Sequence, residues 1–283
     1  MLTSFDGLRL YYRDYGAHDG ATAALCLPGL TRNSRDFDGL AQRLAKTRRV
    51  ICPDYRGRGR SDYDRHWRNY EPRIYLDDLR HLLTALNIHE FIAIGTSLGG
   101  LLASGLAIIV PTALRAVILN DVGPEIQTSG LQRILEQIRS LPPEPSFEQA
   151  ARYLRENYPK LSIADEEGWI DFARSIYRQD GNGAVVADWD PAIVKPLLEP
   201  ADTPADLWKL YRALAKLPML AVRGGVSDVL SEQTFRRMKA EKPDLIQVTV
   251  PGIGHAPSLT EPEVWSAIEE FLEALWRPAP RAG

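Results

Sequence analysis

The chain has 283 residues, of which 45% are hydrophobic and 25% are charged, so it contains enough apolar material for a sizeable folded core. Its 34 Lys and Arg residues against 37 Asp and Glu residues give a net charge of -3, which argues against nucleic acid or an anionic membrane as a partner. The N-terminal stretch MLTSFDGLRLYY has no basic start followed by an apolar run, so we expect no secretory signal and a cytoplasmic protein.

The first part of the chain alternates between strand-like and helix-like stretches. Weak alternation of apolar residues indicates an edge strand, and continuous apolar runs indicate strands buried on both faces. The strands are expected at 8–15, 23–27 and 49–53, and the helices at 37–45 and 70–86. The loop DYRGRGRSD between the last strand and helix holds Gly57 and Gly59. Because a third glycine and a following G-K-[ST] are missing, we expect a tight surface turn there rather than a phosphate-binding loop.

The central stretch reads as strand, sharp turn and helix, with Ser97 at the turn. Residues 91–94 are an apolar run, Gly95 to Gly99 match G-x-S-x-G, and an apolar helix is expected over 98–110. A serine on such a turn needs flanks without side chains, which the glycines supply. A transmembrane span is the alternative for this uncharged segment. We reject it because its glycines and Pro111 leave too short a helix to cross a bilayer.

After another buried strand at 116–120, the pattern changes. From residue 124 to residue 212 we expect helices and no strand, and we interpret this segment as an inserted helical cap. Its helix starts include a capping box at Ser146 and proline-led starts after Asp190 and Thr203.

Alternation of strands and helices resumes near Pro218. The expected strands are 219–222 and 245–250, and the expected helices are 231–239 and 262–275. The whole pattern predicts an α/β fold with a doubly wound, mostly parallel sheet, made by a core domain of residues 1–123 and 213–283. In such sheets the ligand site lies beyond the carboxyl ends of the strands.

A serine hydroxyl needs a neighbouring base to become a nucleophile near neutral pH, and imidazole suits that role. Of the five histidines, only His255 follows a strand on a glycine-rich loop at the expected end of the sheet. The imidazolium then needs an oriented carboxylate. We expect Asp228 in this role because it follows the preceding strand, with Asp121, which also ends a strand, as the competitor.

An anion that forms beside Ser97 requires hydrogen-bond donors. The sequence Leu27-Pro28-Gly29-Leu30 places a flexible glycine before an amide that can face the serine. We therefore expect the backbone N–H groups of Leu30 and Leu98 to be the two donors. No metal site is expected, because the sequence has no CxxC, HxxxH or HExxH pairing.

Taken together, these motifs resemble the α/β-hydrolase fold family. The matching segments are G-T-S-L-G-G, L-P-G-L, D-Y-R-G-R-G-R-S-D, S-D and G-H, and the resemblance spans the whole chain, cap included. One departure is Leu27, where many members have histidine. The resemblance implies acyl transfer to Ser97, hydrolysis by water activated at His255, no cofactor, and cap residues that choose a small-molecule substrate.

The expected activity is therefore hydrolysis of a small carboxylic ester or a related carbonyl compound by a serine hydrolase. The main alternative is a carbon-carbon bond hydrolase for ring-cleavage products, in which Arg32 and Asn33 would hold a substrate carboxylate. Lactonase, aminopeptidase and perhydrolase readings share the same three side chains, and a non-catalytic ligand sensor is the alternative from another class. The sequence leaves open whether the chain forms a homodimer.

Overall fold

The computed structural model describes residues 1–16, 21–199 and 206–275. Its centre is a seven-stranded sheet with the order β11-β10-β7-β6-β4-β5-β3. Only the β3–β5 pair is antiparallel, and the other neighbours run parallel. The strands are β3 Tyr12–Tyr15, β4 Ala23–Leu27, β5 Val50–Pro53, β6 Phe91–Thr96, β7 Leu114–Asn120, β10 Met219–Gly224 and β11 Ile246–Val250. The predicted doubly wound, mostly parallel sheet is confirmed.

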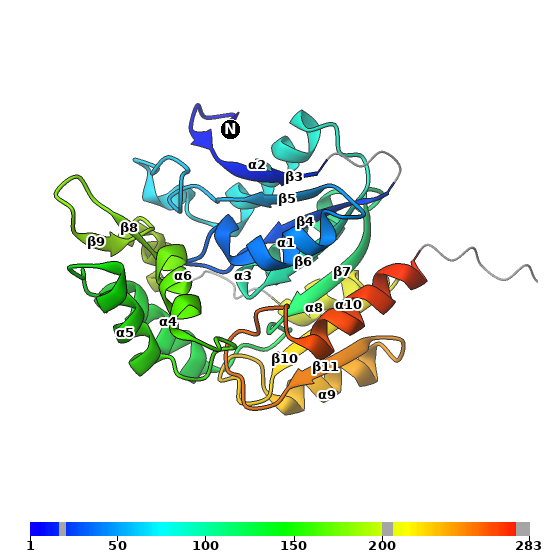
Figure 1. Ribbon diagram of the computed structural model, residues 1–283. Helices are drawn as coiled ribbons and strands as arrows, with labels where there is room; N and C mark the ends of the chain where they lie inside the picture. The colour runs from blue at the N-terminus through cyan, green and yellow to red at the C-terminus, as the bar shows by residue number, and fades with distance from the viewer. Residues whose placement is uncertain (17–20, 200–205, 276–283) are drawn as a thin grey trace, which may run out of the picture.

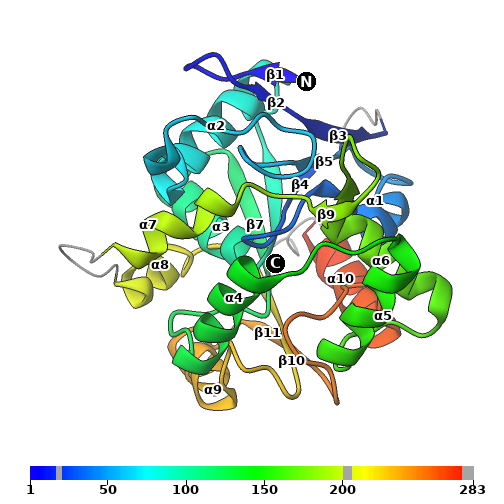
Figure 2. The same ribbon diagram turned by 90° about the vertical axis from the view of Figure 1, so that its left-hand side faces the viewer.

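Helices cover both faces of the sheet because alternate strand residues point to opposite sides. On β4, Leu25 and Leu27 pack with one helix layer, whereas Ala24 and Cys26 pack with the other. Figure 2 shows the sheet between these two layers. The first layer comprises α2 Pro72–Ala85, α3 Leu98–Ile109, α8 Leu207–Ala213 and α9 Glu232–Glu241, and the second comprises α1 Asp38–Leu44 and α10 Pro262–Ala274.

Between β7 and β10 the chain forms a group of elements at the carboxyl ends of the parallel strands, drawn in green to yellow-green in Figure 1. They are α4 Thr128–Ser140, α5 Phe147–Asn157, α6 Glu166–Ile176, β8 Tyr177–Gln179, β9 Val185–Ala187, the 3-10 helix η3 Pro191–Val194 and α7 Lys195–Leu198. The expectation of no strand in this segment is wrong, since β8 and β9 form an antiparallel hairpin. The turn at Asp180 to Gly183 closes that hairpin, with Gly183 at φ 87°.

The helices of this group of elements, from α4 to α7, which we refer to as the cap, begin largely where their capping residues predict. Ser146 accepts a hydrogen bond from the Gln149 amide, and Asp190 caps η3 through the Ala192 amide. The start expected at Thr203 lies outside the described residues. The next helix, α8, packs against α3 of the core, although the sequence division assigned it to the cap.

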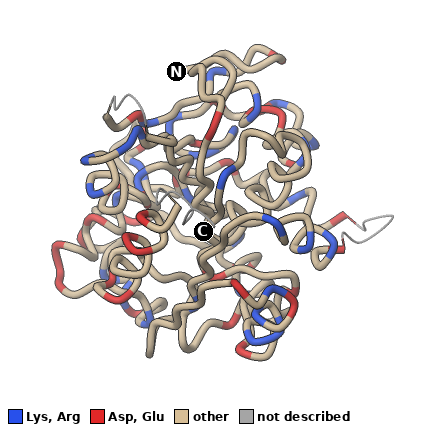
Figure 3. Tube along the Cα trace, turned by 90° about the vertical axis from the view of Figure 1, so that its right-hand side faces the viewer, with Lys and Arg blue, Asp and Glu red and all other residues tan. Residues whose placement is uncertain are grey.

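The remaining described elements are short and lie near the N-terminus or between larger elements. They are β1 Leu2–Thr3, β2 Arg9–Leu10, and the 3-10 helices η1 Ser34–Phe37 and η2 Trp67–Asn69. Acidic and basic residues are interspersed along the trace in Figure 3. None of the helices formed by the described residues has both the length and the hydrophobicity of a membrane-spanning segment.

Candidate active site

Ser97 occupies a strained turn between β6 and α3, as its motif predicts. Its backbone angles are φ 53° and ψ -118°, a conformation that non-glycine residues rarely adopt. The turn needs its glycines, because a Cβ at Gly99 would collide with the Leu27 carbonyl and a Cβ at Gly95 would collide with the backbone of Gly99 and Gly100. The Ser97 amide donates to the Asn120 carbonyl at 3.0 Å, which ties the turn to the end of β7.

His255 lies on the loop after β11 and contacts a buried carboxylate. Its Nδ1 is 2.7 Å from Oδ2 of Asp121, which follows β7 and is fully buried. Two further donors reach this carboxylate: the Gly224 amide at 2.9 Å and the Ser227 hydroxyl at 2.6 Å. A buried carboxylate requires such partners, and they fix its orientation. Since an ionised carboxylate only accepts, Nδ1 of His255 is the donor in this contact.

The expectation that Asp228 orients His255 is therefore wrong. Asp228 lies one residue beyond Ser227, and Ser227 points at Asp121 while Asp228 faces the cap. There Oδ2 and Oδ1 of Asp228 accept from Nε and Nη2 of Arg133 at 2.5 and 2.8 Å. This bidentate hydrogen bond lowers the pKa of Asp228 below its ordinary value. Asp121, the alternative considered from the sequence, makes the contact with the imidazole that was expected of Asp228.

The loop after β4 brings Gly29 and Leu30 next to the serine. A Cβ added at Gly29 would lie 3.7 Å from Cβ of Ser97. Two buried side chains hold this loop by its carbonyls: Tyr55 Oη donates to the Pro28 carbonyl at 3.2 Å, and Arg58 Nε donates to the Leu30 carbonyl at 2.8 Å. Among the described residues no hydrogen bond uses the Leu30 N–H, so this donor remains available.

Arg58 is a functional candidate that the sequence reasoning missed. The predicted tight turn at Gly57 and Gly59 does have the left-handed backbone of such a turn, with φ 74° and 55°. However, Gly57 and the Arg58 side chain are buried, and Gly59 is half-buried. Besides Leu30, Arg58 donates to the Tyr75 hydroxyl at 2.8 Å and to the Arg56 carbonyl at 2.8 Å. Alternation of arginine and glycine gave no signal that these side chains point inward.

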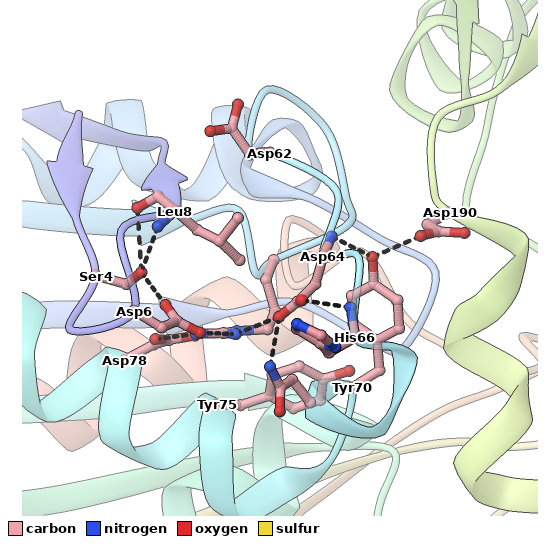
Figure 4. Close-up of polar contacts among 12 residues, drawn as sticks. Ser4, Asp6, Leu8, Asp62, Asp64, His66, Tyr70, Tyr75, Asp78 and Asp190 are labelled. Carbon is pink, nitrogen blue, oxygen red and sulfur yellow. Dashed lines mark hydrogen bonds and ion pairs between the residues drawn. The ribbon is translucent and has the colours of Figure 1, made fainter.

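The preceding arginine, Arg56, anchors the same loop through three carboxylates. It donates to Asp78 at 2.7 and 2.8 Å, to Asp64 at 2.6 Å and to Asp6 at 2.8 Å. Figure 4 shows how this network continues from Asp64 through the Tyr70 hydroxyl to Asp190 of the cap. The Asp64 amide donates to Tyr70 at 2.7 Å, and Tyr70 donates to Asp190 at 2.6 Å. The loop that holds Leu30 is thus connected to the N-terminal segment, to α2 and to the cap.

Ser97 and His255 line one pocket of about 560 Å³, and residues of the core loops and the cap form its walls. The volume is that of a small-molecule site. Within the described residues no hydrogen bond joins the Ser97 hydroxyl to the His255 ring. The described residues include no group of three or more His, Cys, Asp or Glu side chains that could hold a metal ion.

Asn33 and Arg32 have other partners than the substrate carboxylate considered from the sequence. Asn33 is almost fully buried, and its Nδ2 donates to the Ser175 carbonyl at 2.8 Å. Arg32 forms a bidentate ion pair with Asp36, donates to the Ser175 hydroxyl at 2.9 Å and stacks on Phe172. Both side chains therefore brace η1 against α6.

Comparison with known proteins agrees with this architecture. Residues 24–268 match the model of the Alpha/beta hydrolase family. The chain is 32% identical over 275 residues to the 3-hydroxybutyrate-oligomer hydrolase of Cupriavidus necator, which covers 93% of this chain and 92% of that protein. It is 30% identical over 255 residues to the 2-(acetamidomethylene)succinate hydrolase of Mesorhizobium japonicum, which covers 87% and 86%.

A crystal structure of an alpha/beta hydrolase from Novosphingobium aromaticivorans has a TM-score of 0.90 and 45% identity to this chain, and the match covers 96% of both chains. The crystal structure of E-2-(acetamidomethylene)succinate hydrolase has a TM-score of 0.79 and 27% identity, with coverage of 94% and 96%. The motif at Ser97, the topology of the sheet and these matches all give one assignment. The chain belongs to the alpha/beta hydrolase family.

Proposed function

We propose that this protein is a serine esterase whose nucleophile is Ser97, whose general base is His255 and whose orienting carboxylate is Asp121. The observation that carries the proposal is the 2.7 Å contact between His255 Nδ1 and the buried Asp121, on a histidine that lines the same pocket as Ser97. Such a contact leaves Nε2 to accept a proton and offsets the charge that results.

The proposed reaction has two steps. The Ser97 hydroxyl transfers its proton to His255 Nε2 as its oxygen attacks the ester carbonyl carbon, and the alcohol then departs with that proton, which leaves an acyl group on the serine. Next, a water molecule gives a proton to His255 and attacks the acyl carbon, and the serine oxygen takes the proton back as the acid is released. The route uses side chains, backbone amides and water, without a cofactor.

The negatively charged oxygen of each intermediate would accept hydrogen bonds from the amides of Leu30 and Leu98. Leu30 lines the pocket, and Leu98 opens α3, where the helix dipole adds to its donor strength. Both act through the backbone, so their side chains do not carry the effect.

We further propose short oligoesters of hydroxy acids as the substrate class. Support comes from the Cupriavidus necator relative, whose name gives 3-hydroxybutyrate oligomers as what it hydrolyses and which aligns with nearly the whole chain. Such oligomers are esters, in agreement with the proposed chemistry. The pocket of about 560 Å³ has room for a molecule of that size.

A second candidate is hydrolysis of another small carboxylate compound by the same side chains. The Mesorhizobium japonicum relative, a 2-(acetamidomethylene)succinate hydrolase, favours it. For the carbon-carbon bond alternative, Arg32 lines the pocket but pairs with Asp36, and Asn33 donates to the Ser175 carbonyl, so these contacts alone do not favour it.

Two measurements test the proposal. A fluorophosphonate probe should add one label to the wild-type protein and none to Ser97→Ala, as read by intact-protein mass spectrometry. Rates should then be compared on 3-hydroxybutyrate dimer, nitrophenyl esters of increasing chain length, a ring-cleavage dienone acid and 2-(acetamidomethylene)succinate. A protein that never labels and hydrolyses none of these compounds would point to a ligand sensor instead.

A further inference from the structure

One wall of the pocket carries three polar side chains that the proposed reaction does not use. Arg133 and Gln137 lie four residues apart on α4, so they share one face of the helix, and Tyr158 directly follows α5. Ile134, Leu161, Ile163, Phe172 and Ile176 also line the pocket. Polar groups that share a pocket with so many apolar side chains fix the orientation of a ligand.

Arg133 keeps unused donors in this wall. In its bidentate contact with Asp228, Arg133 donates through Nε and through one hydrogen of Nη2. No hydrogen bond to another described residue uses Nη1, and the side chain is 34% exposed. The paired carboxylate raises the pKa of Arg133, so the guanidinium stays charged.

Two neutral side chains beside Arg133, those of Gln137 and Tyr158, can also donate hydrogen bonds to a ligand. Neither the side-chain amide of Gln137 nor the hydroxyl of Tyr158 has a hydrogen bond to another described side chain or carbonyl. Burial raises the pKa of Tyr158, so the phenol keeps its proton at neutral pH. Guanidinium, amide and phenol together offer donors to a group that only accepts.

We propose that Arg133, Gln137 and Tyr158 form a subsite for a carboxylate of the substrate. The substrate is then an ester that also bears a free acid within a few bonds of the scissile carbonyl, as the acid end of a hydroxy-acid oligoester does. The inference deepens the proposed function and rests on it. Arg32 and Arg35 also line the pocket and are paired with Asp36 and Asp188, as Arg133 is with Asp228. Arg133 differs in having Gln137 and Tyr158 beside it, whose side-chain polar groups have no hydrogen bond to another described residue.

Asp228 is the positioning residue of this subsite. It holds the guanidinium fork in place and also cancels its charge, so the subsite attracts an anion mainly through hydrogen bonds. A neutral residue of the same shape at position 228 would keep a partner for Arg133 and remove the opposing charge. Asp228→Asn is therefore expected to strengthen the preference for an acidic substrate, and Arg133→Gln to weaken it.

The test compares kcat/KM for the 3-hydroxybutyrate dimer with kcat/KM for its carboxamide, in which a neutral amide group replaces the free acid. We expect Arg133→Gln to lower this acid-to-amide ratio by about ten-fold, the usual effect of a hydrogen bond between charged groups. Arg139→Gln is the matched control, since Arg139 lies on the same helix, is exposed and does not line the pocket. It should leave both rates as they are.

A fall of less than about three-fold in folded Arg133→Gln would overturn the subsite, and any larger fall supports it. Should Arg133→Gln not fold, Asp228→Asn decides: a raised ratio supports the subsite, and an unchanged or lowered ratio overturns it. Ser97→Ala distinguishes a failure of the proposed function from a failure of the proposed subsite. Hydrolysis that survives in Ser97→Ala contradicts the proposed function itself, whereas a need for Ser97 with an unmoved ratio contradicts only the subsite.

Discussion

The loops after β7 and β10 each place an aspartate at the carboxyl edge of the sheet, yet the two carboxylates have different environments. Asp121 is fully buried and is held by the Gly224 amide, Ser227 and His255. Asp228 is 36% exposed and pairs with Arg133 of the cap. The position of an acid after a strand therefore does not decide its role. The donors that surround it do, and they come from other segments of the chain.

The same contrast holds between the edge of the core and the wall of the cap. At the core edge, backbone hydrogen bonds and close-packed glycines fix Ser97, and the Gly224 amide and Ser227 fix Asp121. Buried side chains hold the loop of Leu30 by its carbonyls. At the cap wall, side chains such as Arg133 are held by ion pairs that a single substitution can remove. We therefore expect changes at the core edge to affect the rate of the chemical step, and changes at the cap wall to affect the choice of substrate.

The largest effect is expected at the base. His255→Gln should lower kcat by at least about 10⁴-fold, because the serine then has no group to take its proton. Steady-state rates on a nitrophenyl ester measure this loss. His89→Gln is the control, since His89 is exposed on the opposite end of β6. Comparable rates for the two variants would remove His255 from the mechanism.

A smaller loss of kcat is expected when the side chain that holds the Leu30 loop, that of Arg58, is replaced. Arg58→Met removes the donor to the Leu30 carbonyl, so the Leu30 amide moves from its place beside Ser97. We expect kcat to fall about 100-fold with little change in KM, because this donor acts in the transition state. Arg60→Met is the control, since Arg60 is exposed and stacks on Tyr11.

Thermal unfolding of both arginine variants shows whether they are folded. A folded Arg58→Met protein with wild-type kcat would contradict the positioning role of Arg58. A rise in KM alone would assign this residue to substrate binding instead.

The hairpin of the cap offers a test of stability rather than of rate. Burial raises the pKa of Asp188 to about 6, although Arg35 pairs with it. Because this pKa lies above the ordinary carboxyl value, the unfolded chain releases the proton first as pH rises, and the carboxylate then destabilises the fold. Between pH 4 and pH 7, the stability of Asp188→Asn relative to wild type should increase by about 2 kcal/mol.

Urea unfolding at the two pH values measures this difference. Asp77→Asn, which removes a half-buried carboxylate paired with Arg80, should show no such dependence. A gap between Asp188→Asn and wild type that stays constant with pH would mean that the buried carboxylate is not destabilising.

Most of the core could be predicted from the sequence, because its signals are local. The apolar runs identify the strands of the sheet, and G-x-S-x-G defines the turn at Ser97. The glycine-rich loop placed His255 at the correct edge for the same reason. Main-chain geometry depends largely on consecutive residues, so a pattern over a few positions is enough to predict a strand or a turn.

The parts that could not be predicted depend on side chains from distant segments. Choosing between Asp121 and Asp228 required knowing that Ser227 turns inward and that Arg133 of the cap reaches Asp228. The burial of Arg58 depends on Tyr75 and on the cap segment beside the loop. The short hairpin in the cap was missed because β8 and β9 have only three residues each.

The proposed function depends on Asp121, and not Asp228, orienting His255. Measuring kcat of Asp121→Asn and Asp228→Asn on one uncharged nitrophenyl ester at neutral pH distinguishes the two carboxylates. We predict a loss of about 10⁴-fold for Asp121→Asn, since the amide favours the wrong tautomer of the imidazole. This loss should exceed the loss in Asp228→Asn by at least about 100-fold. An equal or larger loss in Asp228→Asn would show that Asp121 does not have this role.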